Sequence, residues 1–293
     1  NHEFDYALIL SGDQLYQMDF NAMLEAHIDA EADITIATLP VNDKDAPEFG
    51  ILKTNSESCI DCFIEKPAKE LLPDWKSEVS DEMKSQGKHY LASMGIYIFN
   101  RKLLIELMSN PETKDFGKEI IPQAVGNKKL LSYQYEGYWT DIGNIDSFFE
   151  ANIGLTDDIP QFNLFDNDNK IYTRPRLLSP SKFHKTMVER SLISEGCIIH
   201  AKAVTKSVIG NRSRIGEDTV IQHCYVMGND FYQNIDDINE DNRNGIPLIG
   251  IGERCFIDNA IVDKNCRIGN DVYVKGGKHL ADTSNDLYCV KEG

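Results

Sequence analysis

From about residue 190 to the end of the chain, aliphatic side chains return at every sixth position. The runs are Ile193 and Ile199; Ile209, Ile215, Ile221 and Met227; Ile251 and Ile257; and Val262, Ile268 and Val274. Glycine often follows the aliphatic residue, as at Gly210, Gly216, Gly252 and Gly269. One aliphatic side chain on each short flat face, with glycine at the tight corner, is the repeat of a hexapeptide β-helix. The polar interruption at 229–245 is expected to loop out of the coil.

The first half of the chain has a different pattern, typical of an α/β domain. Residues 6–10 form a short continuous apolar run, as expected for a parallel strand covered on both faces. A helix over 21–32, with Asn21 as its N-cap, and a strand over 34–39 then complete a βαβ unit. Further strands are predicted at 49–53, 59–64 and 90–99, and further helices at 102–108, after an N-cap at Asp115, and at 146–155.

Prolines mark a linker between the two patterns. Pro160, Pro175 and Pro180 stand among clustered Asp and Asn residues, which is a loop composition. We therefore predict a first domain at 1–155, a linker at 156–185 and a β-helix domain at 186–293. The chain opens with Asn almost directly into a strand and stops inside the six-residue rhythm, so we expect both domains to be incomplete at their outer ends.

The charge balance limits the partners of the chain. It has 30 basic and 47 acidic side chains and a formal net charge of −17. Nucleic acids and anionic membranes are bound by clustered Lys and Arg, so neither is expected as a partner. The seven cysteines do not resemble a disulfide framework and are interpreted as reduced thiols. No apolar run reaches the length of about 18 residues that a membrane span requires, and we expect a cytoplasmic protein.

Two aspartates follow apolar strand-like runs and could share a divalent cation. Asp13 ends the stretch Leu-Ile-Leu-Ser-Gly-Asp, and Asp141 ends Tyr-Trp-Thr-Asp. In open α/β sheets, ligands bind at the carboxyl edge of the strands. Each aspartate taken alone could equally cap a turn or a helix. A cation there would help an acidic chain to bind phosphorylated ligands.

Four further residues are candidates for ligand binding. Lys66 could meet a phosphate as a point charge, and Glu65 could accept hydrogen bonds from sugar hydroxyls. Gly50 would let the backbone approach a ligand, and Ser93 places a hydroxyl inside an apolar strand. The alternatives are a surface ion pair for Glu65 and Lys66, a strand bulge at Gly50 and a buried serine that is satisfied locally.

His223 raises a separate possibility, because some hexapeptide β-helices belong to acyltransferases with a histidine base. A solvent-facing histidine on a coil is the more common case. A chain with this second activity would need His223 for acetyl transfer.

Taken together, these segments resemble glucose-1-phosphate adenylyltransferase, the ADP-glucose pyrophosphorylase family of bacterial glycogen synthesis. The matching stretches are LILSGDQLYQMDF (8–20), EFG (48–50), FIEKPA (63–68), ASMGIYIFN (92–100), DFGKEIIP (115–122) and YWTDIGNIDSFFEAN (138–152). The six-residue rhythm follows in the order that the family has, so the resemblance covers nearly the whole chain.

The resemblance implies a fold, a reaction and a set of roles. The fold is a Rossmann-like α/β nucleotidyltransferase domain followed by a left-handed parallel β-helix. The reaction joins ATP and glucose 1-phosphate to give ADP-glucose and pyrophosphate. Asp13 and Asp141 would hold the catalytic Mg²⁺, Gly50, Glu65, Lys66 and Ser93 would line the sugar-phosphate pocket, and Lys66 would meet the phosphate. Members of the family are allosteric and usually homotetrameric.

One family motif does not occur in the chain. The Gly-rich GGxGTRLxPLT loop, which cradles the triphosphate, is missing, and Gly276-Gly277-Lys278 lies in the β-helix pattern. We therefore expect the full-length protein to be the enzyme and these 293 residues alone to be inactive. The open alternatives are a guanylyl- or uridylyltransferase and a non-catalytic regulatory subunit.

Overall fold

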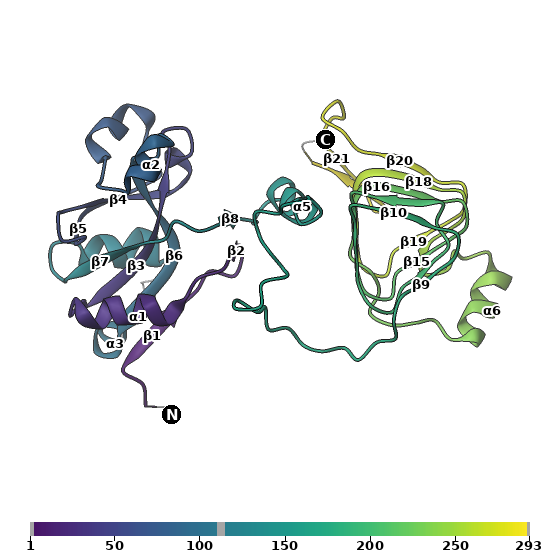
Figure 1. Cartoon of the computed structure of the whole chain (residues 1–293), viewed down its shortest axis with the longest axis horizontal. Coiled ribbons are helices and arrows are strands. Elements are labelled where there is room, and N and C mark those ends of the chain that lie inside the picture. Colours follow the sequence, from purple (N-terminus) through teal and green to yellow (C-terminus); the bar gives the residue numbers. More distant parts are fainter. Residues whose placement is uncertain (1–2, 110–114, 292–293) are drawn as a thin grey trace. The chain divides into compact units, whose positions relative to one another are not determined.

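The computed structural model describes residues 3–109 and 115–291. They form two compact units, divided between Trp139 and Thr140, and Figure 1 shows the elements of each. None of the helices among these residues is long and apolar enough to cross a membrane.

The first unit is built on a mixed sheet of six strands, in the order β5-β4-β6-β3-β7, with β1 also paired to β6. The strands are β1 (Tyr6–Ile9), β3 (Ile34–Val41), β4 (Gly50–Thr54), β5 (Ile60–Glu65), β6 (Tyr90–Asn100) and β7 (Leu130–Gln134). Strand β3 runs parallel to β7 and antiparallel to β6. The long central β6 also pairs with β1 and β4, so it connects most of the sheet.

Helices bury both faces of this sheet, because successive strand residues point to opposite sides. On one face, Met23 of α1 (Phe20–Asp29) packs with Ala37 and Met94. On the other face, Leu103 of α3 (Arg101–Leu107) packs with Ile36 and Phe99. The α/β class that the sequence predicts is therefore confirmed.

The remaining elements of the first unit are short. They are β2 (Gln14–Tyr16), η1 (Ala46–Glu48), η2 (Lys69–Trp75), α2 (Asp81–Ser85), η3 (Phe116–Ile120), α4 (Ile121–Ala124) and the first residue of β8 (Trp139–Asp141). The predicted cap is present, since Asp115 Oδ1 accepts a hydrogen bond from the Lys118 amide at 2.9 Å.

Two local predictions for this unit are wrong. Strand β1 is not a parallel strand covered on both faces: its partner β6 is antiparallel, and Tyr6 and Leu8 are exposed. An apolar run does not reveal the direction of its neighbour. The N-cap of α1 is Asp19, whose Oδ1 accepts from the Asn21 amide at 2.8 Å, because a cap must precede the first helical residue.

The second unit is the β-helix, whose short parallel strands stack coil on coil (Figure 1). The strands are β9 (Lys182–Phe183), β10 (Met187–Glu189), β11 (Leu192–Ile193), β12 (Ile198–Ile199), β13 (Ala203–Thr205), β14 (Val208–Ile209), β15 (Arg214–Ile215), β16 (Val220–Val226), β17 (Gly250–Ile251), β18 (Phe256–Val262), β19 (Arg267–Ile268) and β20 (Tyr273–Lys275). A hairpin of β21 (Thr283–Ser284) and β22 (Cys289–Val290) follows.

The six-residue rhythm becomes ladders of stacked side chains. Ile199, Ile215, Ile251 and Ile268 pair in one ladder, and Val204, Ile221, Ile257 and Val274 pair in another. Most of these side chains belong to one buried core, to which Cys197, Cys224 and Cys255 also contribute. Each coil buries its aliphatic positions against the next, as the repeat predicts.

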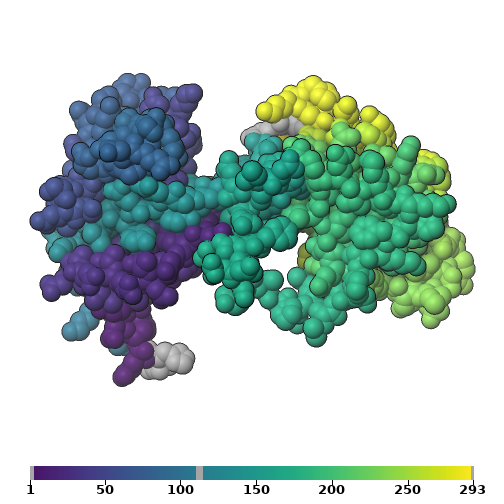
Figure 2. All heavy atoms as spheres, in the orientation of Figure 1, coloured from purple at the N-terminus to yellow at the C-terminus, as the bar shows by residue number. Residues whose placement is uncertain are grey.

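Two helices accompany the coils. The interruption at 229–245 loops out, as predicted, and contains the helix α6 (Ile235–Asn244), which forms a bulge on the surface of this unit (Figure 2). Helix α5 (Ile145–Gly154) packs against β16, although the sequence predicts this helix as the end of the first domain. The domain limits at 155 and 186 stay a prediction.

Candidate active site

Asp13 lies in the connection between β1 and β2. Its carboxylate is exposed, and Asp13 Oδ1 accepts a hydrogen bond from Ser11 Oγ at 2.5 Å. The next residue, Gln14, accepts a hydrogen bond at its Oε1 from Trp139 Nε1 at 3.1 Å. The loop that carries Asp13 is thus held from both sides while the carboxylate faces solvent.

Gly50 and Glu65 face each other across the β4–β5 pair. A Cβ at Gly50 would lie 2.9 Å from Glu65 Oε2 and 2.7 Å from Phe63 Cζ. Any side chain at position 50 would therefore displace the Phe63 ring and the Glu65 carboxylate. The preceding Phe49 packs edge-on against the Trp139 ring at 5.5 Å, which links this pair to the Asp13 loop through Gln14.

Lys66 follows directly after β5 and has a left-handed backbone, with φ of 46°. Its amide donates to Phe49 O at 3.0 Å, and its side chain is exposed, whereas Pro67 is buried. A left-handed conformation costs a lysine about 1–2 kcal/mol, and such strain is concentrated at functional sites. The ammonium of Lys66 is thereby presented to solvent at the end of the strand that carries Glu65.

Ser93 lies on β6 and shares a side-chain hydrogen bond with Tyr97. The intervening Gly95 has φ of 70°, and a Cβ there would lie 3.7 Å from Ser11 Cβ. This bend of β6 therefore lies against the loop that leads to Asp13. Burial raises the pKa of the Tyr97 phenol above its ordinary value; the Ser93 hydrogen bond opposes the rise, and the carboxylates of Glu65 and Asp115 add to it. Tyr97 therefore stays a hydrogen-bond donor near neutral pH.

The first unit therefore brings several predicted residues into one neighbourhood. A Cβ at Gly50 would touch the Glu65 carboxylate, the charge of Glu65 helps to raise the pKa of Tyr97, and Tyr97 shares a hydrogen bond with Ser93. Two residues that were not predicted to bind a ligand also lie here: a Cβ at Gly117 would be 3.5 Å from Asp115 Oδ1 and 3.8 Å from Glu65 Oε2. Their only signal was the DFG stretch at 115–117 within the resemblance.

Asp141 ends β8 and belongs to the second unit. Its carboxylate is exposed, and Asp141 Oδ1 accepts a hydrogen bond from the Gly143 amide at 2.7 Å. Asp13 and Asp141 thus fall in different units, and their sharing of one ion stays a prediction.

His223 does not face open solvent. Its ring packs edge-on against Phe149 of α5 at 5.1 Å, and its Nδ1 lies 2.8 Å from Asn259 Oδ1. Helix α5 contacts the ring on one side and the next coil contacts it on the other. Packing therefore accounts for the position of His223 without a role in acetyl transfer.

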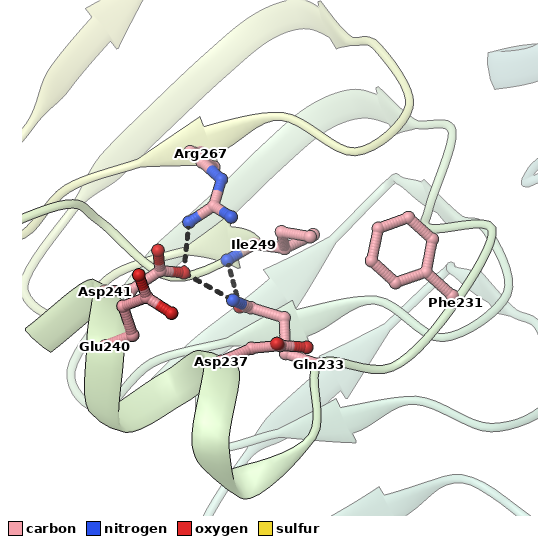
Figure 3. A pocket seen from close by; sticks show the side chains of 7 residues that line it. All are labelled: Phe231, Gln233, Asp237, Glu240, Asp241, Ile249 and Arg267. Carbon is pink, nitrogen blue, oxygen red and sulfur yellow. Dashed lines mark hydrogen bonds and ion pairs between the residues drawn. The ribbon is translucent and has the colours of Figure 1, made fainter.

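A hollow of about 160 Å³ lies beside α6 (Figure 3). Its polar walls are largely paired with each other: Arg267 Nη1 donates to Asp241 Oδ2 at 2.6 Å, and Gln233 Nε2 donates to the same oxygen at 2.6 Å. The Arg267 hydrogen bond is the main cause that lowers the pKa of Asp241. These contacts tie α6 to the coil.

Comparison with known families identifies both halves of the chain. The family model described as nucleotidyl transferase matches residues 1–158. The chain belongs to the nucleotidyl transferase family. A second model, described as the GLGC left-handed parallel beta-helix domain, matches residues 176–293. This combination confirms the predicted fold class and supports a nucleotide-sugar pyrophosphorylase.

The nucleotidyltransferase family implies a nucleotide and a sugar phosphate as substrates. A carboxylate such as that of Glu65 can accept hydrogen bonds from hydroxyl groups, and a cation such as that of Lys66 can pair with a phosphate, but these two roles stay predictions. Helix α5 falls within the nucleotidyl transferase match and yet packs on the β-helix. The family segment therefore extends in sequence beyond the first compact unit.

The donor chemistry of the two aspartates fits Mg²⁺, which prefers one or two carboxylates together with substrate phosphates. Both carboxylates are exposed, and the local hydrogen bonds described above engage only their Oδ1 atoms. Within residues 3–109 and 115–291, no group of three or more His, Cys, Asp or Glu side chains that could hold a metal ion occurs.

Proposed function

We propose that the full-length protein is a glucose-1-phosphate adenylyltransferase, which forms ADP-glucose and pyrophosphate from ATP and glucose 1-phosphate. The sequence motifs at 8–20 and 138–152 favour this enzyme over guanylyl- and uridylyltransferases. The resemblance extends the proposal to glycogen biosynthesis, allosteric control and a homotetramer.

The observation that carries the proposal is the neighbourhood of Gly50, Glu65 and Ser93, with Lys66 at its edge. A carboxylate, a hydroxyl and a glycine-lined approach are suited to a sugar, whose hydroxyls both donate and accept hydrogen bonds. The strained backbone of Lys66 presents a cation beside them. These features support a sugar phosphate as the ligand.

The chain's residues have a limited task in this reaction. An oxygen of glucose 1-phosphate attacks the α-phosphorus of ATP, and pyrophosphate leaves. Because the nucleophile is already an anion, no general base is needed. Glu65 and Ser93 would orient the sugar, and Lys66 would offset the charge of its phosphate, so that attack occurs in line.

Asp13 and Asp141 would hold Mg²⁺. The ion, when bound, supplies positive charge to the phosphates of ATP and to the leaving pyrophosphate. Asp13 contributes from a loop fixed by Ser11 and Gln14, and Asp141 from a turn closed by Gly143.

The test is pyrophosphate release by the full-length protein from glucose 1-phosphate with ATP, GTP or UTP. We expect ATP to be preferred. Lys66→Ala should raise the KM for glucose 1-phosphate by about 10- to 100-fold, the value of a hydrogen bond to a charged group. Asp13→Asn should lower kcat by at least about 100-fold, as the loss of a transition-state contact does.

Lys53→Ala is the matched control, because Lys53 is an exposed lysine on β4 that donates to Asp74 O at 2.8 Å. It should leave both constants unchanged. Preference for GTP or UTP would establish another nucleotide-sugar pyrophosphorylase. Turnover that persists in Asp13→Asn would contradict the metal assignment.

A further inference from the structure

Asp141 stands at the start of a short, well-connected segment of the second unit. Its Oδ1 accepts from the Gly143 amide at 2.7 Å. The next residue, Asn144, caps α5 by accepting at Oδ1 from the Ser147 amide at 2.8 Å. The orientation of the carboxylate therefore depends on where α5 begins.

The β-helix holds α5 through two ring contacts. Phe148 packs against Tyr225 with ring centroids 5.4 Å apart, and Phe149 packs edge-on against His223 at 5.1 Å. Both partners lie on β16, two residues apart. Such aromatic pairs contribute about 0.5–1.5 kcal/mol each beyond the area that they bury.

His223 occupies a corner position that recurs in successive coils. The strand register aligns Glu189, Thr205, Gln222 and Asp258. The residues that follow them share a left-handed backbone: Arg190, Lys206, His223 and Asn259 have φ of 43°, 45°, 49° and 53°. Histidine and asparagine tolerate this conformation better than most residues. Asn259 Oδ1 also forms a hydrogen bond with His223 Nδ1 at 2.8 Å. The corner thus fixes the ring that meets Phe149.

The same corner also holds the far end of α5. Arg190 Nη2 lies 3.2 Å from Asp157 Oδ1, and Arg190 Nε lies 3.6 Å from Asp158 Oδ1. Both aspartates follow α5 directly, after its C-cap at Leu155. One β-helix corner therefore contacts the helix in its middle and just beyond its end.

We propose that Arg190, His223 and Tyr225, here called the α5 clamp, are positioning residues for Asp141. The inference rests on the proposed role of Asp141 in holding Mg²⁺. By fixing α5, the clamp fixes the turn at Gly143 and hence the direction of the carboxylate. A metal ligand must be held within about 0.5 Å of its working geometry. The β-helix then contributes to catalysis through the position of Asp141, without touching substrate.

The first measurement is hydrogen exchange by mass spectrometry on the full-length protein, over peptides that cover residues 141–147. His223→Asn keeps a residue suited to the left-handed corner and removes the ring; Tyr225→Ala removes the second ring. Each should speed exchange of this segment by about two- to tenfold, the equivalent of one aromatic pair. Tyr225→Phe keeps the ring and should restore the wild-type rate.

The second measurement is the Mg²⁺ concentration that gives half-maximal activity. The same two variants should raise it by about two- to tenfold, with a smaller change in the KM for glucose 1-phosphate. Arg190→Ala, which removes exposed ion pairs, should act in the same direction and more weakly.

Matched controls come from other coils. Tyr273→Ala removes a ring that stacks on Phe256 at 5.1 Å, and Arg254→Ala removes an exposed ion pair with Asp271 at 2.7 Å. Neither residue contacts α5 in these interactions, so neither variant should change exchange at 141–147 or the Mg²⁺ requirement.

The outcomes separate this inference from the proposed function. If Asp141→Asn leaves turnover and the Mg²⁺ requirement unchanged, the metal role of Asp141 is wrong. If Asp141→Asn abolishes turnover while His223→Asn and Tyr225→Ala leave both readouts unchanged, the clamp is wrong and the function stands. A lower melting temperature with unchanged exchange at 141–147 and an unchanged Mg²⁺ requirement would likewise overturn the clamp, because it shows a purely structural role.

Discussion

Lys66 is a candidate for phosphate binding and also has an energetically costly left-handed backbone. Its φ of 46° is a conformation that glycine adopts freely and a lysine does not. The hydrogen bond from the Lys66 amide to Phe49 O and the buried Pro67 that follows hold the residue in this conformation. Glycine would adopt this conformation without the cost, although Glu31 and Ser58 of the same unit also have a left-handed backbone.

The left-handed backbone of Lys66 leads to a prediction about stability. Lys66→Gly and Lys66→Ala both remove the charge, but only glycine relieves the left-handed backbone. We expect Lys66→Gly to have a free energy of unfolding about 1 kcal/mol above that of Lys66→Ala, measured by urea denaturation. Both should weaken glucose 1-phosphate binding alike. Equal stabilities would show that the backbone at position 66 is not strained.

At the scale of elements, helix α6 gains little stability from the burial of its side chains. None of its residues is buried, and it begins with a capping box in which Asn234 Oδ1 accepts from the Asp237 amide at 2.9 Å. It ends at Gly245, whose φ of 68° is the left-handed C-cap that glycine favours. Local capping and the Asp241–Arg267 ion pair therefore stabilise this helix.

Removal of the cap should open α6 alone. Asn234→Ala should cost about 1 kcal/mol and speed hydrogen exchange over residues 235–244 by about fivefold. The melting temperature of the protein should stay the same, because α6 adds no residue to the core. Asn239→Ala, an exposed position inside the helix, is the control and should slow exchange slightly, since alanine is the better helix former. A global loss of stability in Asn234→Ala would contradict a local role.

The elements that the sequence predicts well are those with strong periodicity or a turn between two runs. The hairpin of β4 and β5, the long β6 and the aliphatic ladders of the β-helix are of this kind. The antiparallel pairing of β1 was missed because hydrophobicity carries no direction, and α6 because most of its residues are polar and none is buried. The N-cap of α1 was misplaced by two residues, from Asp19 to Asn21.

The candidate site shows the same limit. Motifs drew attention to Gly50, Glu65 and Ser93, which do lie together in the first unit. Tyr97 was missed, because a tyrosine in an apolar strand looks like one more core residue. Its hydrogen bond to Ser93 follows from the bend of β6 at Gly95, and a bend of this kind depends on tertiary packing.

At the scale of the whole molecule, the two units have separate hydrophobic cores. The sheet core of the first unit contains Ile36, and the core of the β-helix contains Ile221; both side chains are completely buried. Units with their own cores can unfold independently. The stacked coils of the second unit and the mixed sheet of the first also bury their side chains in different ways.

We therefore expect calorimetry to resolve two unfolding transitions. Ile36→Ala and Ile221→Ala should each cost about 2–5 kcal/mol, the range for such truncations in a packed core. Each variant should lower the midpoint of one transition and leave the other in place. The two variants are matched, because they remove the same atoms from equally buried positions. If either substitution lowered both midpoints equally, the chain would unfold as one cooperative body, and the division at residue 139 would have no energetic meaning.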